Sequence, residues 1–243
     1  MSDSSDNIYA NQQQTSPFKF DTKVAAVFPD MIKRSVPGYG KTLHNIQLLA
    51  SNYIKSNSRC YDLGCSLGAA SLAMSFGNRG KNVEIIGVDN SSAMLERCQS
   101  HIDAFKHHTP IRLVKEDLQQ LKINNASMVV LNYTLQFIPQ NSRLEVIQSI
   151  FDGMNPGGLL VLSEKLEFED HEINQLMIEL HHQFKRENGY SELEISQKRN
   201  ALDKVLIPET MKAHFERLDS VGFQKTACLQ QQLNFATLIA IKP

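Results

Sequence analysis

The 243 residues carry 25 lysines and arginines against 26 aspartates and glutamates, a formal net charge of −1. With a pI near 6.7, this balance argues against direct nucleic-acid binding, because a strongly basic binding surface raises the pI above about 9. No apolar run approaches the ~20 residues of a bilayer span and no signal peptide opens the chain, so we expect a cytoplasmic protein without membrane contact.

The first two predicted helices follow a polar tail. Residues 1–17 contain mostly Ser, Asp, Asn and Gln, which predicts a disordered tail, and we expect one domain over 18–243. Apolar residues then recur at helical spacing over Asp21–Ser35, although Pro29 is expected to interrupt that helix. Lys41–Lys55 is a second amphipathic helix.

Strands and helices alternate through the centre of the chain, which predicts a parallel sheet with right-handed crossovers. The predicted strands are Arg59–Leu63, Val83–Val88, Ile111–Val114, Ser127–Asn132 and Leu159–Leu162. The predicted helices are Ala69–Phe76, one from about Ala93 and one over Ser142–Phe151. A tight turn is expected at 155–158, and a terminal hairpin is expected over Gln224–Leu229 and Asn234–Ile241.

A charged, helical insertion is expected at about 165–221, between the fifth strand and the terminal hairpin. Ile173, Met177, Leu180 and Phe184 mark the apolar face of one of its helices. Ser191 and Glu194 have the spacing of a capping box, which predicts the start of another helix. This insertion should overhang the edge of the sheet where the strands end.

The strand ends hold the main candidate site. Asp62 ends the first strand, Gly64 and Gly68 bracket the turn that follows, and Asp89 ends the second strand. A carboxylate at the second strand end accepts hydrogen bonds from ribose hydroxyls. The turn lacks a P-loop pattern, and Asp62 would repel a pyrophosphate, so a cationic nucleoside such as S-adenosylmethionine fits better. The alternative is that the glycines only mark the start of a helix.

Three further residues are weaker candidates. Asp117, with Leu118, follows the third strand and suits an adenine ring, although an ordinary solvated turn has the same composition. Asn132 ends the fourth strand and is either a ligand contact or a satisfied buried amide. Arg199, in the insertion, is a candidate clamp for a small anion, although such a residue usually lies on a solvated helix face.

Metal chemistry is not expected. The adjacent histidine pairs at 107–108 and 181–182 point in different directions and cannot share an ion. The four cysteines show no CxxC pairing, which indicates reduced thiols and no structural zinc; they are Cys60, Cys65, Cys98 and Cys228. No Ser-His-Asp or Cys-His arrangement is evident either.

Two resemblances narrow these alternatives. The glycine-bracketed turn resembles motif I of class I S-adenosylmethionine-dependent methyltransferases, with Ser66 where the middle glycine usually stands. Five segments, within a resemblance that covers about 18–242, look like the carboxy-S-adenosylmethionine synthases. They are Val27–Ile32 (VFPDMI), Arg34–Tyr39 (RSVPGY), Tyr61–Ala70 (YDLGCSLGAA), Asn125–Asn132 (NASMVVLN) and Asn188–Arg199 (NGYSELEISQKR).

The resemblance implies a Rossmann-like α/β methyltransferase fold with seven strands, the last antiparallel, and a homodimer. It also implies a transferase that converts S-adenosylmethionine and prephenate into carboxy-S-adenosylmethionine and phenylpyruvate. The product supplies the oxyacetic acid modification of wobble uridines in tRNA. The cofactor-binding positions carried over are Tyr39, Gly64, Cys65, Ser66, Asp89, Asn90, Asp117, Leu118, Asn132 and Arg199.

The implied mechanism assigns little acid–base work to the protein. Hydroxide shed by prephenate takes the proton from the methyl group, and Arg199 holds the new carboxylate as the catalytic residue. The protein contributes proximity and the exclusion of water. A small-molecule methyltransferase and a non-catalytic nucleoside-binding module remain the alternatives, because the core alone fits both.

Overall fold

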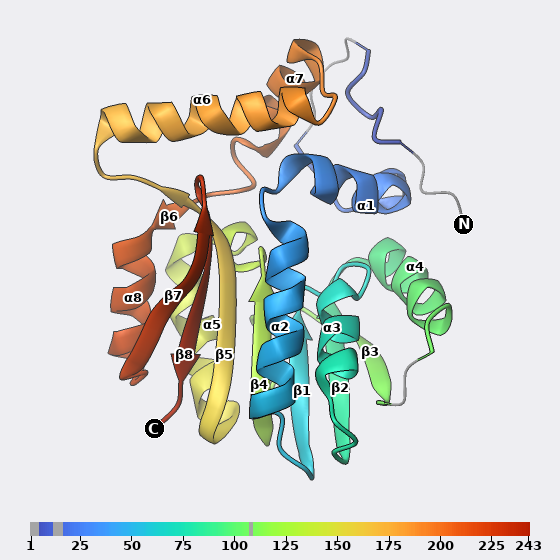
Figure 1. The fold of residues 1–243 in the computed structure, drawn as a ribbon, viewed down its shortest axis with the longest axis vertical. Helices are drawn as coiled ribbons and strands as arrows, with labels where there is room; N and C mark the ends of the chain where they lie inside the picture. The colour runs from blue at the N-terminus through green and yellow to red at the C-terminus, as the bar shows by residue number, and fades with distance from the viewer. Residues whose placement is uncertain (1–4, 12–16, 107–108) are drawn as a thin grey trace.

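One mixed sheet forms the centre of the computed structural model, which describes residues 5–11, 17–106 and 109–243. Its long strands are β1 (Ser58–Leu63), β2 (Val83–Asp89), β3 (Ile111–Lys115), β4 (Ala126–Asn132), β5 (Met154–Glu167), β7 (Lys225–Gln232) and β8 (Phe235–Ile241). Their order is β3-β2-β1-β4-β5-β8-β7 (Figure 1), and among them β8 alone runs against the rest. The predicted seven strands with an antiparallel last strand are therefore confirmed.

Helices lie on both faces of the sheet and beyond the edge where its parallel strands end. They are α1 (Thr22–Ser35), α2 (Tyr39–Tyr53), α3 (Ala69–Gly77), α4 (Ser92–Asp103), α5 (Gln140–Gly153), α6 (His171–Glu187), α7 (Glu192–Leu202) and α8 (Met211–Ser220), with a 3₁₀ turn, η1 (Leu135–Phe137). Helix α1 continues through Pro29, since the missing N–H removes only one intrahelical bond. None of the described helices combines the length and apolar character of a bilayer span.

The central strands are buried on both sides, and their side chains alternate between two cores. Met128 and Val130 of β4 pack with α2 and α3, whereas Val129 and Leu131 pack with α5 and the end of α8. This explains why these strands read as continuous apolar runs rather than as alternating ones. The two layers of helices hold the carboxyl ends of β1, β2 and β4 in fixed positions.

Two regions differ from the sequence prediction. The turn expected at 155–158 lies inside the longer strand β5, where Gly157 has φ +73° and the pairing with β4 shifts register. Within the predicted insertion, α8 returns to the sheet and packs Leu218 into the hydrophobic core between the sheet and α5. A two-residue strand, β6 (Glu209–Thr210), pairs with the end of β5 just before α8. Only α6, α7 and the following loop extend away from the sheet.

Helices α1, α6 and α7 lie beyond the edge of the sheet where β1, β2 and β4 end (Figure 1). We refer to α6 and α7 together as the lid. The capping box predicted at the start of α7 is confirmed, because Ser191 and Glu194 bond each other's backbone N–H. The lid thus faces the strand ends that carry the predicted site.

Candidate active site

A cavity of about 690 Å³ separates the strand ends from the lid. One wall comes from the loops after β1, β2, β3 and β4, and the opposite wall from β5, α6 and α7. In open α/β sheets, ligands bind at this edge because the loops after parallel strands meet there. The cavity is therefore the candidate active site.

The turn after β1 is tight and lies close to the neighbouring chain. Gly64 has φ +76° and Ser66 has φ +49°, a left-handed conformation that costs energy for a non-glycine residue. A Cβ on Gly64 would lie 2.4 Å from the Cγ2 atom of Thr134, so only glycine fits there. The turn bonds to the next strand, because the N–H groups of Gly64 and Cys65 both donate to the carbonyl oxygen of Val88.

Asp89 is fixed at the end of β2 by backbone donors. Its Oδ2 atom accepts from the N–H of Ser66 and its Oδ1 atom from the N–H of Ser91, each at 2.9 Å. Burial raises the pKa of the Asp89 carboxyl, and these bonds oppose that effect. Each oxygen keeps a second lone pair, which fits the two hydroxyls of a ribose.

Asp62 is buried at the end of β1. Its Oδ2 atom accepts from the N–H and the hydroxyl of Ser71, at 2.8 and 2.6 Å, while Oδ1 has no hydrogen bond to any described residue. Burial raises the pKa of this carboxyl to about 6, against the effect of the Ser71 bonds. A cationic group near Oδ1 would stabilise the ionised form. The residue thus suits the positively charged end of a ligand.

Asn132 offers an unused acceptor. Its Oδ1 atom is buried without a hydrogen-bond partner in the described residues. Tyr133, the next residue, has φ +61°, a strained conformation that turns the chain into the cavity wall. Buried polar atoms are normally paired, so the orphaned oxygen indicates that a ligand N–H or O–H belongs there.

The lid wall carries positive charge without a matching negative charge. Lys165 of β5, Lys185 of α6 and Arg199 of α7 all line the cavity. None of these side chains forms an ion pair with a carboxylate among the residues described, in contrast to Arg186, whose Nη1 atom lies 3.0 Å from Glu192. Lys185 is buried, although the sequence pattern suggested a solvated face for its cluster. An unpaired buried cation is costly, which indicates an anionic ligand.

Several known proteins are similar to this chain. Residues 61–158 match the family described as a methyltransferase domain. A carboxy-S-adenosyl-L-methionine synthase of Pseudoalteromonas atlantica is 52% identical over 242 residues, which cover 100% of both chains. A carboxy-S-adenosyl-L-methionine synthase of Shewanella piezotolerans is 50% identical over 243 residues, again 100% of both. The chain belongs to the carboxy-S-adenosyl-L-methionine synthase family.

Solved structures support the same fold for this family member. A putative S-adenosyl-L-methionine-dependent methyltransferase of Methanococcus maripaludis aligns with a TM-score of 0.60 at 18% identity, covering 96% of this chain and 98% of that one. Magnesium protoporphyrin IX methyltransferase of Synechocystis gives a TM-score of 0.61 at 16% identity, covering 88% and 87%. At these identities the likeness concerns the fold alone, and it confirms the predicted class I methyltransferase fold.

All ten positions carried over from the synthase family line this one cavity. Asp117 accepts from the N–H of Gln119 at 2.9 Å, and Leu118 packs against the core beside it. Arg199, although exposed, lies across the cavity from these residues. The geometry brings the predicted residues together, while their individual ligand contacts stay predictions.

The N-terminal segment at 5–11 contacts the lid, an arrangement that sequence reasoning missed. The prediction of a disordered tail partly concerns 1–4 and 12–16, which lie outside the described residues, whereas 5–11 are described and make contacts with the lid. Asp6 is buried, lies 3.3 Å from the Nζ atom of Lys198 and accepts from the hydroxyl of Tyr190. Local composition gave no signal for this, because the partners are 184 and 192 residues away.

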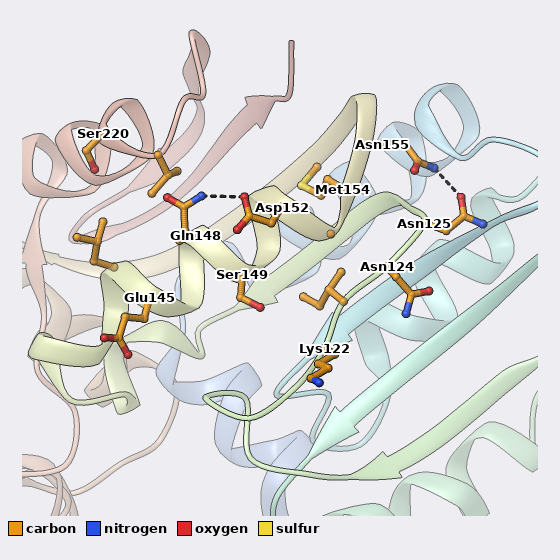
Figure 2. A pocket seen from close by; sticks show the side chains of 14 residues that line it. Lys122, Asn124, Asn125, Glu145, Gln148, Ser149, Asp152, Met154, Asn155 and Ser220 are labelled. Atoms are coloured by element: carbon orange, nitrogen blue, oxygen red, sulfur yellow. Dashed lines mark hydrogen bonds between the residues drawn. The ribbon is translucent and has the colours of Figure 1, made fainter.

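A second hollow lies at the opposite edge of the sheet, near the first residues of β4 and β5 (Figure 2). Its polar side chains bond one another: Gln148 donates to Asp152 at 2.9 Å, and Asn155 donates to Asn125 at 2.8 Å. These internal bonds leave no convergent set of unpaired groups, so we assign no ligand to this hollow.

Proposed function

We propose that this protein makes carboxy-S-adenosylmethionine from S-adenosylmethionine and prephenate and releases phenylpyruvate. The observation that carries the proposal is the opposite charge of the two cavity walls. Asp62 and Asp89 face the cavity from the strand ends, and Arg199 lines it from the lid without a carboxylate partner among the described residues. A plain methyltransferase needs only the first wall, whereas a carboxylated product needs both.

The strand-end wall holds the part of the ligand that substrate and product share. Asp89 accepts from the ribose hydroxyls, Asp117 and Leu118 contact the adenine, and Asp62 and Asn132 face the cationic amino acid end. Charge-assisted bonds of this kind contribute about 1.5–3 kcal/mol each. This wall therefore contributes most of the affinity and little of the discrimination between S-adenosylmethionine and its carboxylated form.

The bound substrates supply the reactive groups, since the sulfonium acidifies its methyl group and prephenate gives up carbon dioxide and hydroxide as its ring becomes aromatic. In the balanced reaction, the methyl carbon loses a proton to the hydroxide, which leaves as water, and forms a bond to the carbon dioxide. Arg199 holds the resulting carboxylate through its guanidinium. The lid excludes water and keeps the carbon dioxide close, so no general base from the protein is required.

Mass spectrometry of the reaction products tests this proposal. The purified protein, incubated with S-adenosylmethionine and prephenate, should form a species heavier than S-adenosylmethionine by the mass of one carbon dioxide, together with phenylpyruvate. Omitting prephenate should abolish both products. If S-adenosylmethionine binds but survives prolonged incubation with prephenate unchanged, the synthase function is wrong. Methylation of an added acceptor would instead support the methyltransferase alternative.

We further propose a homodimer in the cytoplasm whose product is used for tRNA modification by another enzyme. Ile173 and Leu176 on α6 and Leu193 on α7 are exposed apolar side chains on the lid, which supports association with a second copy. Light scattering during gel filtration tests the dimer. A monomer at all concentrations would contradict it.

A further inference from the structure

We propose that Lys165 and Lys185, together with a neighbouring aromatic cluster, form a subsite for the arylpyruvate part of the second substrate. Specifically, they hold the carboxylate that stays on phenylpyruvate after the other has left as carbon dioxide. This inference rests on the proposed function and adds the residues that recognise prephenate. The carried-over positions include neither lysine.

The fold brings the two lysines to the same place. Lys165 on β5 is the direct partner of Phe235 on β8, so the two side chains lie on one face of the sheet. The ring of Phe235 contacts that of His181 on α6, with centroids 4.9 Å apart. Lys185 follows His181 by four residues and therefore lies on the same side of that helix. Both lysines line the active-site cavity.

Hydrogen bonds hold both elements in position. The N–H of Lys165 donates to the Oε1 atom of Gln136 at 2.9 Å, and the carboxylate of neighbouring Glu164 accepts from the N–H groups of Leu135 and Gln136. On α6, a ring nitrogen of His181 lies 2.8 Å from the carbonyl oxygen of Ser35. The lysine side chains are therefore presented from fixed backbone rather than from flexible loops.

The electrostatics of the pair calls for an anion. Lys185 is only 7% exposed, and among the described residues no carboxylate lies within ion-pair distance of either ammonium. Burial lowers the pKa of Lys185 to about 7 and also lowers the pKa of Lys165. Buried charges without partners are unfavourable, so a ligand carboxylate between the two lysines would stabilise both ammonium groups.

An apolar wall beside the lysines matches the rest of an arylpyruvate. Tyr133 and Phe235 belong to one buried cluster, against which Tyr39 packs. Their ring centroids lie 6.3 Å apart for Tyr39 and Tyr133, and 5.8 Å apart for Tyr133 and Phe235. A six-membered carbon ring that becomes aromatic during the reaction suits such a surface.

The two carboxylates of prephenate then have separate partners. The ring carboxylate becomes carbon dioxide and ends on the product, where Arg199 holds it. The carboxylate on the pyruvyl side chain does not react, and Lys165 and Lys185 hold it throughout. A substrate anchored at a non-reacting group keeps its ring beside the methyl group when carbon dioxide is released.

The test compares Lys165→Met and Lys185→Met with Arg186→Met, which removes an exposed charge from the same helix. We expect the KM for prephenate to rise roughly ten- to a hundredfold in the two lysine variants, because each loses a charge-assisted bond. The dissociation constant for S-adenosylmethionine, measured by calorimetry, should stay within about twofold of wild type. Arg186→Met should leave both quantities unchanged, and Lys185→Arg should restore most of the KM.

An unchanged KM for prephenate in both lysine variants overturns the inference, as does an equal loss of S-adenosylmethionine affinity. If circular dichroism shows that a methionine variant is unfolded, Lys185→Gln and Lys185→Arg replace it in the test. Equal KM values for prephenate in these two variants would overturn the inference that the charge of Lys185 binds the substrate. Calorimetric titration of phenylpyruvate into the wild type separates this inference from the synthase function. If phenylpyruvate binds and the lysine variants weaken it, but no carboxy-S-adenosylmethionine forms, the subsite is supported and the synthase function is contradicted. If phenylpyruvate does not bind, the subsite is overturned.

Discussion

The two walls of the active-site cavity differ in charge and in how their charged groups are held. On the strand-end wall, Asp62 and Asp89 are anchored by backbone N–H groups of the helices and turns that follow their strands. On the lid wall, Lys165, Lys185 and Arg199 lack carboxylate partners among the described residues. The carboxylates of the first wall are held in position before a ligand arrives, whereas the cations of the second wall gain their partners from the ligand's own carboxylates.

This difference assigns separate tasks to the walls. A preorganised site binds whatever carries the matching nucleoside, because its groups pay no cost of rearrangement. An unpaired cation discriminates instead, since it favours a ligand that places a carboxylate against it. We therefore expect substitutions on the strand-end wall to weaken S-adenosylmethionine and carboxy-S-adenosylmethionine alike. Substitutions of the lid cations should weaken mainly carboxy-S-adenosylmethionine and prephenate.

The largest effect is expected for Asp89→Ala. It removes the proposed acceptor of two ribose hydroxyls and releases the N–H groups of Ser66 and Ser91. Affinities for S-adenosylmethionine and carboxy-S-adenosylmethionine should both fall, by roughly a hundredfold or more. Calorimetry with both ligands measures this. Asp103→Ala, on the exposed side of α4, should change neither, and a loss confined to one ligand would contradict the assignment of Asp89 to the ribose.

Arg199→Leu should separate the two ligands. In the proposed function its guanidinium holds the carboxylate present only in the product, so the affinity for carboxy-S-adenosylmethionine should fall roughly ten- to a hundredfold. The affinity for S-adenosylmethionine should change much less. Arg186→Leu removes a nearby exposed charge of the lid and serves as the control. Equal losses for both ligands would mean that Arg199 only supports the lid.

The affinity for prephenate should depend on pH through Lys185. Burial first, and then the charges of Lys198, Lys165 and Arg199, lower the pKa of its ammonium to about 7. The carboxylate binds the protonated lysine, so affinity is full below pH 7 and declines as the pH rises through that value. The KM for prephenate should increase roughly tenfold between about pH 7 and pH 8.5. Further titratable groups that line this side of the cavity are His181, His182 and, at the end of α7, Asp203.

Lys185→Arg provides the comparison for this pH profile, because arginine stays charged over the whole range. Its KM should be nearly constant where that of the wild type rises. Measurements at constant ionic strength exclude screening as the cause. A wild-type profile as flat as that of the arginine variant would show that Lys185 does not titrate in contact with the substrate.

The smallest effect is expected for Asp6→Ala, at the contact between the N-terminal segment and the lid. Lys198, adjacent to Arg199, loses its carboxylate, and Tyr190 loses its acceptor. If Arg199 then keeps its ligand-facing position for only a half to a fifth of the time, carboxy-S-adenosylmethionine binds about two- to fivefold more weakly. A double-mutant cycle with Arg199→Leu tests this, because Asp6→Ala should cause no further loss of carboxy-S-adenosylmethionine affinity when Arg199 is already replaced. Equal losses in both backgrounds would contradict coupling through Arg199.

The sequence alone determined the sheet, its helices and the strand-end wall. Hydrophobic periodicity marks which side chains are buried, and glycines mark turns, so both signals are local. Asp89 and Asn132 are the last residues of their strands, and parallel strands bring such positions to one edge. Local pattern therefore sufficed to place this wall.

Only the tertiary structure decided the lid wall. Lys185 and Arg186 are adjacent and chemically alike, yet one is buried in the cavity and the other is exposed. Asp6 lies in a polar stretch that predicts disorder, but Lys198 and Tyr190 bury it across most of the length of the chain. Ion pairs between distant residues leave no periodic trace in a sequence, because they depend on how elements pack rather than on their own composition. The anionic subsite follows from that packing.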